Sequence, residues 1–353
     1  MRSVLHLAGS HCSFNISLTN SRNGCFWAFP VRQMPKMDVS VCIANWNCRD
    51  MLQACLRSLL HQPQGVRLEV IVVDNASTDS AAEMVAHEFP EVVLVRNTEN
   101  RGFAKANNQA AELAQGRYLF FLNNDTVTPE RTLEKLMAFA DAHPQLGMIG
   151  PRLRDSFGDF QISYRKRPTV AVLLHRTVLF RWTRLFGRGY RDYRRNGFNP
   201  FHHGPVDLLM GAAVFMPQAV FEERGRWDED FPFGGEDLEL AARVGRVYPI
   251  YYLPDVEITH YGRVSSRLNI GFSTESVAAG YIQYLRKMGT PNWQIVAYKL
   301  AVTIDSPLQL LGKVLEYRFR RLAGRHEKAQ KSLLAARGLW HFVRHSYPKF
   351  WKA

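Results

Sequence analysis

The chain has 353 residues, of which 46% are hydrophobic and 12% aromatic, a composition typical of a globular protein with a large buried core. No apolar run approaches the roughly 18 residues of a membrane span, so we expect no segment to cross a bilayer. The formal net charge of +13 favours anionic partners.

The positive charge is concentrated in two segments. Residues 161–200 carry ten Lys or Arg residues against one acidic residue, and residues 281–353 carry fourteen against three. The remainder of the chain is net negative, so the sequence indicates an acidic body with two basic appendages.

All five cysteines lie within the first 55 residues, and none forms a CxxC pair or alternates with histidine at metal-ligand spacing. This pattern fits a reducing cytoplasm better than a disulfide framework. Residues 1–37 lack a sustained period and the apolar centre of a signal peptide. We expect them to form a disordered or irregular tail, or to come from a reading frame extended upstream of Met37.

From Val39 onward, the hydrophobic pattern predicts strands that alternate with helices. This order implies a parallel sheet with right-handed crossovers. The predicted strands are 39–44, 68–73, 92–95 and 118–122, and the predicted helices are 49–60, 80–88 and 104–114.

Polar residues follow three of these strands, at the edge where open α/β sheets bind ligands. Asn45 and Asn47 follow the first strand, Asp74 ends the second, and Asp125 follows the apolar strand YLFFL. One carboxylate together with substrate phosphates is typical of a Mg²⁺ or Mn²⁺ site, which makes Asp125 a candidate ligand. Each tip alone is also consistent with a capped turn, so the prediction of a nucleotide-type site depends on all three together.

The segment NTENRGFAKANN, residues 97–108, follows the Asp74 turn. Gly102 indicates a close approach of the backbone to another group, and Asn100, Lys105 and Asn107 surround it. Asn and Gly also form ordinary turns, so the segment becomes a candidate through its place in the order.

The segment FGGEDLELAAR predicts a helix that begins at Glu236 and Asp237. Both carboxylates lie at the positive end of the helix dipole, which favours the ionised form that a general base needs. A helix cap without chemistry is the alternative. His260, after the predicted strand YYLPDVEIT, is either a metal ligand or an ordinary histidine.

Three residues near this helix are candidates for the acceptor side of a site. Gly211 lies among small residues that would leave room for a sugar or an acceptor. Trp227 and Asp228 could stack on and bind a sugar, although Trp is more often a packing residue.

The basic appendages allow more than one interpretation. Residues 165–195 interleave arginine with aromatic residues, which predicts a mobile loop over the site or one that touches acidic lipid headgroups. Nucleic-acid binding is the competing interpretation, and the sheet-edge motifs argue against it. After Ser276 the chain predicts four amphipathic helical segments, whose apolar faces either lie on an anionic bilayer or pack on the main domain.

In this order, VSVCIANWN, VVDNASTD, NRGFAKANN and LNND resemble the inverting family 2 glycosyltransferases, in particular their bacterial rhamnosyltransferase-like branch. The similarity continues through GRWDEDFPFGGEDLELAAR and YLPDVEITHYGRVSS. It implies a GT-A fold, an α/β Rossmann-like mixed sheet flanked by helices that binds a nucleotide-diphosphate sugar. The expected organisation is an irregular tail (1–37), a GT-A catalytic domain (38–280) and a basic helical extension (281–353).

The resemblance also implies roles for single residues. Asp74 resembles the carboxylate that recognises the nucleotide base, and Asp237 the catalytic base, with Glu236 in support. Asp125 and His260 resemble the metal ligands. Asn123 stands where a strict DxD motif has Asp, which weakens charge neutralisation at the cation. The complete set of donor-binding candidates is Asn45, Asn47, Asp74, Asn100, Gly102, Asn107, Asn123 and Asn124.

We therefore expect a metal-dependent inverting hexosyltransferase that uses Mg or Mn and a dTDP- or UDP-type sugar donor, with rhamnose as the first sugar to test. The expected acceptor is a glycan or lipid-linked glycan in cell-surface polysaccharide synthesis. We expect a cytoplasmic protein peripheral to the inner membrane face, with no nucleic-acid partner. The alternatives are a non-catalytic nucleotide-sugar-binding scaffold at the membrane and a nucleotidyltransferase, although IANWNCRD lacks the phosphate loop that the latter needs.

Overall fold

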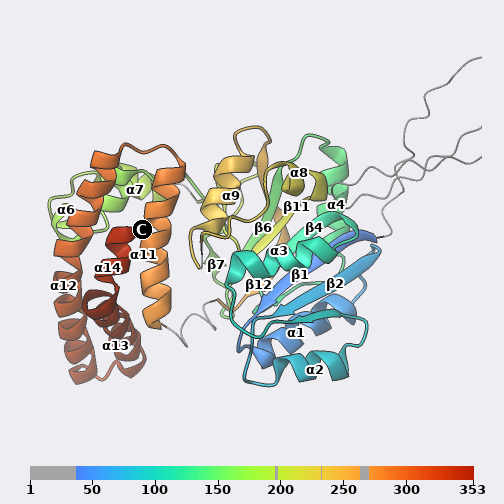
Figure 1. The fold of residues 1–353 in the computed structure, drawn as a ribbon, viewed down its shortest axis with the longest axis horizontal. Helices are drawn as coiled ribbons and strands as arrows, with labels where there is room; N and C mark the ends of the chain where they lie inside the picture. Colours follow the sequence, from blue (N-terminus) through green and yellow to red (C-terminus); the bar gives the residue numbers. More distant parts are fainter. Residues whose placement is uncertain (1–36, 195–197, 232, 263–269) are drawn as a thin grey trace, which may run out of the picture. The chain divides into compact units, whose positions relative to one another are not determined.

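The computed structural model describes residues 37–194, 198–231, 233–262 and 270–353 (Figure 1). The expectation of an irregular tail at residues 1–36 lies outside the described residues. Met37, the last residue of that expected tail, opens the first strand.

Within the described residues, ten strands form one mixed sheet whose main path runs β3-β2-β1-β4-β11-β6-β12-β5. The four strands predicted from the sequence run parallel, as expected, whereas β11 runs antiparallel to β4. The short β7 pairs with β6, β9 pairs with β12, and β8 and β10 form a separate two-stranded sheet. The strands are β1 Met37–Asn45, β2 Leu68–Asp74, β3 Val93–Arg96, β4 Gly116–Leu122, β5 Thr126–Val127, β6 Met148–Arg154, β7 Phe160–Gln161, β8 Tyr164–Arg165, β9 Gly204–Pro205, β10 Leu208–Leu209, β11 Ala213–Pro217 and β12 Ile250–His260.

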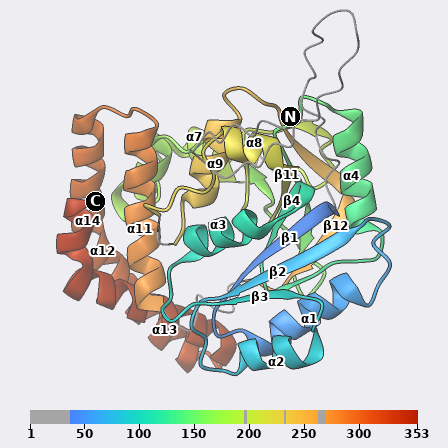
Figure 2. The same ribbon diagram turned by 45° about the vertical axis from the view of Figure 1, so that its right-hand side comes forward.

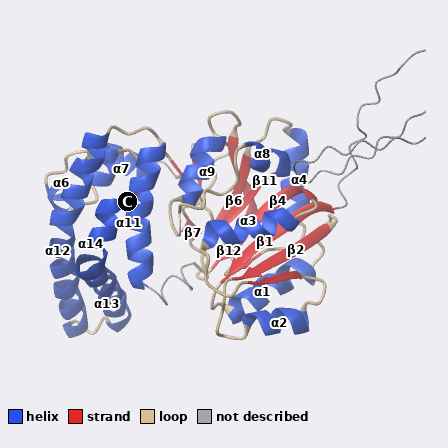
Figure 3. Ribbon diagram, in the orientation of Figure 1, coloured by secondary structure: helices blue, strands red, loops and turns tan. Residues whose placement is uncertain are grey.

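Helices cover both faces of the sheet (Figures 2 and 3), because side chains of a strand point alternately to its two faces. Val39, Val41 and Ile43 of β1 join the core beneath α1, α2 and α4, whereas Cys42 joins the core beneath α3, α8 and α9. The helices of these two layers are α1 Arg49–Leu60, α2 Ala81–Glu88, α3 Phe103–Leu113, α4 Thr132–Ala142, α8 Gln218–Glu223 and α9 Glu236–Val244.

The C-terminal part is helical, as predicted. It comprises α11 Ile270–Lys287, α12 Asn292–Leu322, α13 His326–His341, a π-helical turn Phe342–Ser346 and α14 Tyr347–Lys352. Ile282 and Tyr284 of α11 belong to the same buried cluster as Leu240 of α9. The boundary expected at residue 280 lies inside α11. In the part of the chain that the structure describes, no helix is long and apolar enough to cross a membrane.

The predicted break between the second and third C-terminal segments is wrong, because α12 continues through Pro307. Proline has no N–H, so the carbonyl oxygen of Thr303, four residues earlier, lacks its usual helical partner. The Tyr347 hydroxyl of α14 donates to that oxygen at 2.9 Å and replaces the missing bond. A contact from another helix thus keeps α12 continuous.

The loop predicted for the basic segment is also wrong. Residues 170–194 form α5 Val170–Leu174, α6 Val178–Trp182 and α7 Gly187–Arg194. The Thr169 hydroxyl caps α5 by accepting from the Val172 N–H at 3.3 Å. Asp305 of α12 accepts from the Val178 N–H at 2.5 Å, which fixes α6 beside α12.

Candidate active site

The ends of β1, β2 and β4 meet in one hydrogen-bonded cluster. The Asn45 amide donates to Asp74 Oδ1 at 2.9 Å, and its own oxygen accepts from the Asn124 amide at 2.7 Å. Asp74 Oδ2 accepts from the Ser77 N–H at 3.0 Å. Asn45, Asp74 and Asn124 are all buried, so each tip residue stabilises the next and the cluster is rigid.

Asn47 stabilises the neighbouring turn. It adopts a left-handed conformation with φ of 48°, which asparagine tolerates better than most residues. Its side-chain oxygen accepts from the Thr78 N–H at 2.7 Å, and its backbone N–H donates to the Ser77 hydroxyl at 2.9 Å. The structure thus brings Asn47 beside the loop that follows Asp74.

Gly102 lies at the start of α3 with φ of 84°, a conformation that favours glycine. Its N–H donates to Asn100 Oδ1 at 3.0 Å, and its carbonyl oxygen accepts from the Asn75 amide at 3.1 Å. The NRG segment therefore lies next to the Asp74 turn. Its position after that turn in the sequence was the reason for proposing it as part of the donor-binding site.

Asn107 does not join this cluster. Its side chain is buried in α3 and donates to the Phe103 carbonyl oxygen at 3.1 Å, and its side-chain oxygen has no hydrogen-bond partner among the described residues. The next residue, Asn108, binds the backbone of Trp227 through both ends of its amide, at 2.9 and 3.1 Å. Asn107 was one of the candidate donor-binding residues, and in the structure it lies away from the cluster at the sheet edge.

Asp125 and His260 meet at the opposite side of the β4 tip. His260 is the last residue of β12 and pairs with Thr126 of β5, which directly follows Asp125. This register places His260 Nε2 at 3.3 Å from Asp125 Oδ1 and at 3.3 Å from the Asn123 amide. The two candidate metal ligands, 135 residues apart in number, are thus adjacent in space.

Gln161 of β7 fixes the orientation of His260, a role that the sequence analysis missed. The Gln161 amide donates to the His260 carbonyl oxygen at 2.6 Å, so its Oε1 faces His260 Nδ1 at 2.8 Å. An amide oxygen only accepts, so Nδ1 carries a proton, and in the neutral imidazole the lone pair is then on Nε2. No local signal marks Gln161, because the β6–β7 pairing brings it there.

These residues fit a divalent cation. Asp125 Oδ1 and His260 Nε2 are both lone-pair atoms, and they face one another across 3.3 Å. The carboxylate oxygen suits Mg²⁺ or Mn²⁺, which commonly take further ligands from substrate phosphates and water, whereas the imidazole nitrogen favours a first-row transition metal such as Mn²⁺ over Mg²⁺. Within the described residues, no group of three or more His, Cys, Asp or Glu side chains could hold a metal ion. A cation here would thus need oxygen atoms from a bound donor.

The helix α9 begins at Glu236 and Asp237, as predicted. Asp237 accepts from the Gly211 N–H at 3.1 Å and from the Leu238 N–H at 2.9 Å. Gly211 is small because of Asp237, since a methyl group at Gly211 would lie 3.1 Å from the Asp237 Cβ. The small residue that the sequence analysis singled out at position 211 thus faces the candidate base.

Burial dominates the ionisation of this pair. It raises the pKa of Asp237 above its ordinary value, against the hydrogen bonds from Gly211 and Leu238 and the charge of Arg165. Burial and then the Asp237 charge raise the pKa of Glu236, whose Oε2 has no hydrogen-bond partner among the described residues. The helix position favours the ionised form, as expected of a helix N-terminus, but burial acts in the opposite direction and raises the pKa of both carboxylates.

Two adjacent residues connect the candidate base to the candidate metal ligands. The Gly211 N–H donates to Asp237, and the next residue, Ala212, accepts from the Asn123 N–H at 2.9 Å through its carbonyl oxygen. Asn123 in turn contacts His260. The strand tip with Asp125 and the helix with Asp237 therefore lie on either side of the short segment between β10 and β11.

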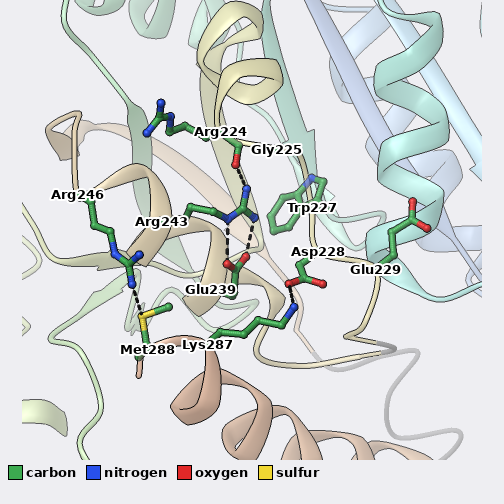
Figure 4. Close-up of a pocket in the computed structure, with 10 residues that line it drawn as sticks. All are labelled: Arg224, Gly225, Trp227, Asp228, Glu229, Glu239, Arg243, Arg246, Lys287 and Met288. Atoms are coloured by element: carbon green, nitrogen blue, oxygen red, sulfur yellow. Dashed lines mark hydrogen bonds and ion pairs between the residues drawn. The ribbon is translucent and has the colours of Figure 1, made fainter. Parts of the chain in front are cut away.

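Trp227 and Asp228 both have partners within the protein. Trp227 is only 1% exposed and packs edge-to-face against Phe103 and Phe121. Asp228 forms an ion pair with Lys287 of α11. Both residues line a pocket of about 570 Å³ beside α9, in which Arg243 is also paired with Glu239 (Figure 4). The packing interpretation of Trp227 agrees with its burial.

The architecture is a GT-A fold, as predicted. It combines a mixed sheet with helices on both faces, polar residues at the strand ends along one edge, and a helix beside them that begins with two carboxylates. A solved structure described as GalNAc-T7 with UDP, GalNAc and Mn²⁺ supports this at a TM-score of 0.53 and 15% identity, covering 71% of this chain and 48% of that one. The sequence model described as Glycosyl transferase family 2 matches residues 40–206. This segment of the chain, slightly less than half of its length, is thus similar to glycosyl transferase family 2.

Two curated relatives refine the comparison. The chain is 26% identical over 207 residues to the N-acetylglucosaminyl-diphospho-decaprenol L-rhamnosyltransferase of Mycobacterium tuberculosis, which covers 55% of this chain and 66% of that protein. It is 30% identical over 224 residues to the O-antigen biosynthesis protein RfbC of Myxococcus xanthus, covering 61% of this chain and 16% of that protein. The chain thus spans less than two thirds of the length of these relatives.

Proposed function

We propose that this chain transfers a sugar from a nucleotide-diphosphate donor to a glycan or lipid-linked acceptor, with inversion at the anomeric carbon. Two hydrogen bonds of adjacent residues carry the proposal. The Gly211 N–H donates to Asp237, and the Ala212 carbonyl oxygen accepts from the Asn123 N–H, which connects Asp237 to the strand tip that holds Asp125. An inverting transfer needs a proton acceptor on one face of the sugar and charge stabilisation on the other. Asp237 would supply the proton acceptor, and a cation held at the strand tip would supply the charge stabilisation.

In the proposed step, the acceptor hydroxyl oxygen forms a bond to the anomeric carbon while the bond from that carbon to the diphosphate oxygen breaks. Asp237 takes the hydroxyl proton. Its raised pKa makes its carboxylate a stronger proton acceptor than an ordinary aspartate, and Glu236, whose pKa is raised to about 8, holds its own proton beside it near neutral pH. Protonated Glu236 also spares the site a second buried negative charge.

Asp125 and His260 would hold Mg²⁺ or Mn²⁺, and such a cation would stabilise the negative charge that develops on the leaving diphosphate. Asn123 adds an amide rather than a second carboxylate, so the protein contributes one negative charge at this position. Gln161 holds His260 with Nε2 toward Asp125.

The edge cluster would bind the nucleoside. Each oxygen of Asp74 accepts one bond within the protein, and a carboxylate oxygen can accept a second from the N3–H of uracil or thymine. This supports a UDP- or dTDP-linked donor, with Asn45, Asn47, Asn100, Gly102 and Asn124 forming the walls. We keep rhamnose as the first sugar to test, because the name of the mycobacterial relative specifies it.

The proposed setting is the cytoplasmic face of a membrane, in the synthesis of a cell-surface polysaccharide. A lipid-linked acceptor is consistent with the printed activity of the mycobacterial relative, whose acceptor carries a decaprenol chain. The basic C-terminal helices are consistent with a surface of anionic lipid.

The test is a screen of dTDP- and UDP-sugars with the purified chain and lipid-linked acceptors, with detection of the released nucleoside diphosphate with and without EDTA. Asp237→Asn should lower transfer by about 10²- to 10⁴-fold and leave donor binding unchanged, because only the proton acceptor is lost. Asp50→Asn, at an exposed surface carboxylate, is the control. Unchanged transfer by Asp237→Asn would overturn the assigned base, and donor binding without any transfer would favour a scaffold.

A further inference from the structure

The long helix α12 exposes an apolar stripe along one side. Nine large hydrophobic side chains of α12 are between 46% and 89% exposed. They recur at intervals of three or four residues, and two sets repeat every 11 residues: Trp293, Ile304 and Leu315, and Leu300, Leu311 and Leu322. Residues at such a spacing lie on one side of a straight helix, so the exposed hydrophobic side chains form a stripe about 45 Å long. We refer to these nine residues as the α12 stripe.

The helix α6 extends this surface. Leu179 and Trp182 are 60% and 82% exposed, and the bond from Val178 to Asp305 fixes α6 against the middle of α12. Figure 1 shows α6 beside α12. Soluble proteins rarely expose an apolar area of this extent unless it is a contact surface. The combined α6 and α12 surface therefore requires a partner.

The charges of these elements indicate which partner. Arg181 and Arg184 follow the α6 apolar residues and are exposed, as are Arg318 and Arg321 at the end of α12. The acidic residues of α12 add little exposed negative charge: Asp305 is buried and accepts from the Val178 N–H, and Glu316 pairs with Lys313 and Arg320. The surface thus combines apolar area with uncompensated positive charge.

We propose that the α6 and α12 surface binds an anionic lipid bilayer, with α12 lying in the plane of the interface. An amphipathic helix with apolar residues on one side and arginine beside them is suited to this position, and exposed tryptophans such as Trp182 and Trp293 favour the headgroup level. A second copy of the chain would place arginine against arginine, and an 11-residue repeat does not match the seam of a left-handed coiled coil. This proposal identifies the part of the chain that would contact the membrane named in the proposed function. It rests on the proposed function only for the biological role of that contact.

The test uses the full chain and two kinds of vesicle, one of phosphatidylcholine alone and one containing phosphatidylglycerol at about a third of the lipid. The chain should float with the anionic vesicles and only weakly with the neutral ones. Ile304→Glu combined with Leu311→Glu should weaken this binding by at least about tenfold, because both side chains belong to the stripe. The matched control is Leu113→Glu with Val247→Glu, which adds the same charge at exposed apolar residues elsewhere and should bind as the unsubstituted chain does.

Two further measurements test the surface without the glutamate variants. Brominated lipids should quench tryptophan fluorescence of the unsubstituted chain, and Trp182→Phe with Trp293→Phe should remove most of that quenching. Light scattering without lipid should give a monomer. Absence of vesicle binding, equal binding by the stripe variant and its control, or a lipid-free dimer that the stripe variant dissociates would each overturn the proposal.

The same samples separate this proposal from the proposed function. The stripe variant should retain binding of UDP or dTDP, measured by calorimetry, because the stripe contains none of the candidate donor residues. Vesicle binding by a chain that binds no nucleotide would support the surface and contradict the proposed function. A chain that binds the nucleotide and transfers sugar to a short-chain acceptor, but does not bind vesicles, would support the proposed function and contradict the lipid-binding surface.

Discussion

Gln161 determines which nitrogen of His260 faces Asp125. It does so through two hydrogen bonds, one to the His260 carbonyl oxygen and one from Nδ1. We expect Gln161→Leu to weaken Mn²⁺ binding by about 10- to 100-fold in the presence of UDP, because the imidazole loses its fixed tautomer. Gln161→Glu keeps an acceptor opposite Nδ1 but loses the donor to the carbonyl oxygen, so it should restore binding only in part. A manganese titration followed by electron paramagnetic resonance measures this directly, and equal affinity in all three proteins would contradict the role of Gln161.

Glu236 links the site to stability. Burial and the Asp237 carboxylate raise its pKa from the ordinary 4.5 to about 8, so the folded chain holds this proton more tightly than the unfolded chain. The stability that this proton contributes is fully present below about pH 4.5 and is lost as the pH rises through about 8. Glu236→Gln cannot ionise. We expect its melting temperature to match the unsubstituted chain near pH 4.5 and to exceed it above pH 8.

Thermal unfolding followed by circular dichroism across this pH range gives the comparison. Glu91→Gln, at an exposed carboxylate, is the control and should show no such pH-dependent difference. A Glu236→Gln protein that is less stable than the unsubstituted chain at pH 9 would show that the ionised carboxylate is stabilised instead.

The helix α11 supports the start of α9 through a contact between backbones. A methyl group at Gly280 would overlap the carbonyl oxygen of Gly234, and Gly234 and Gly235 have φ of 82° and 107°. These glycines let α11 lie directly on the turn that presents Glu236 and Asp237. We expect Gly280→Ala to destabilise the fold by about 1–3 kcal/mol and to lower transfer activity, because the turn must shift.

Gly312→Ala is the matched control for this prediction. Gly312 is also helical, but a methyl group there would meet no atom within 4 Å. This change should stabilise the chain by about 0.5–1 kcal/mol through helix propensity and leave activity unchanged. Denaturant titration of both variants tests the pair, and equal effects at the two positions would contradict the contact.

Local patterns predicted the elements of the first half well. The helix α1 was predicted with its observed bounds, Arg49–Leu60, because its apolar face follows the helical period throughout. Prediction failed where distant contacts decide the outcome. Pro307 indicates a break unless the Tyr347 hydroxyl replaces the missing bond, and the arginine-rich segment looks like a loop unless α12 supports its short helices.

The candidate site shows the same division. Asp125, His260 and Asp237 could be proposed from motifs and a family resemblance, but their adjacency depends on the β5–β12 register and on the segment between β10 and β11. Gln161 has no motif at all. The raised pKa values of Glu236 and Asp237 were not predicted, because helix position is visible in a sequence, whereas desolvation is not.

Across the whole chain, the acidic body and the two basic appendages correspond to different tasks. The sheet edge holds the candidate donor and metal residues, and the basic segments form the helices that carry the α6 and α12 surface. For both basic segments a lipid surface was one of the interpretations that the sequence left open, and their contact through Val178 and Asp305 makes them parts of one surface. Chemistry and docking are thus assigned to separate residues, which allows each to be tested without the other.

The most direct test is a crystal structure of the Asp237→Asn variant with Mn²⁺ and the nucleotide-sugar that the donor screen identifies. We expect the diphosphate and the cation beside Asp125 and His260, the base beside Asp74, and the anomeric carbon between the cation and residue 237. A donor bound away from Asp125, or a residue 237 that faces a cavity separate from the sugar, would contradict the shared site.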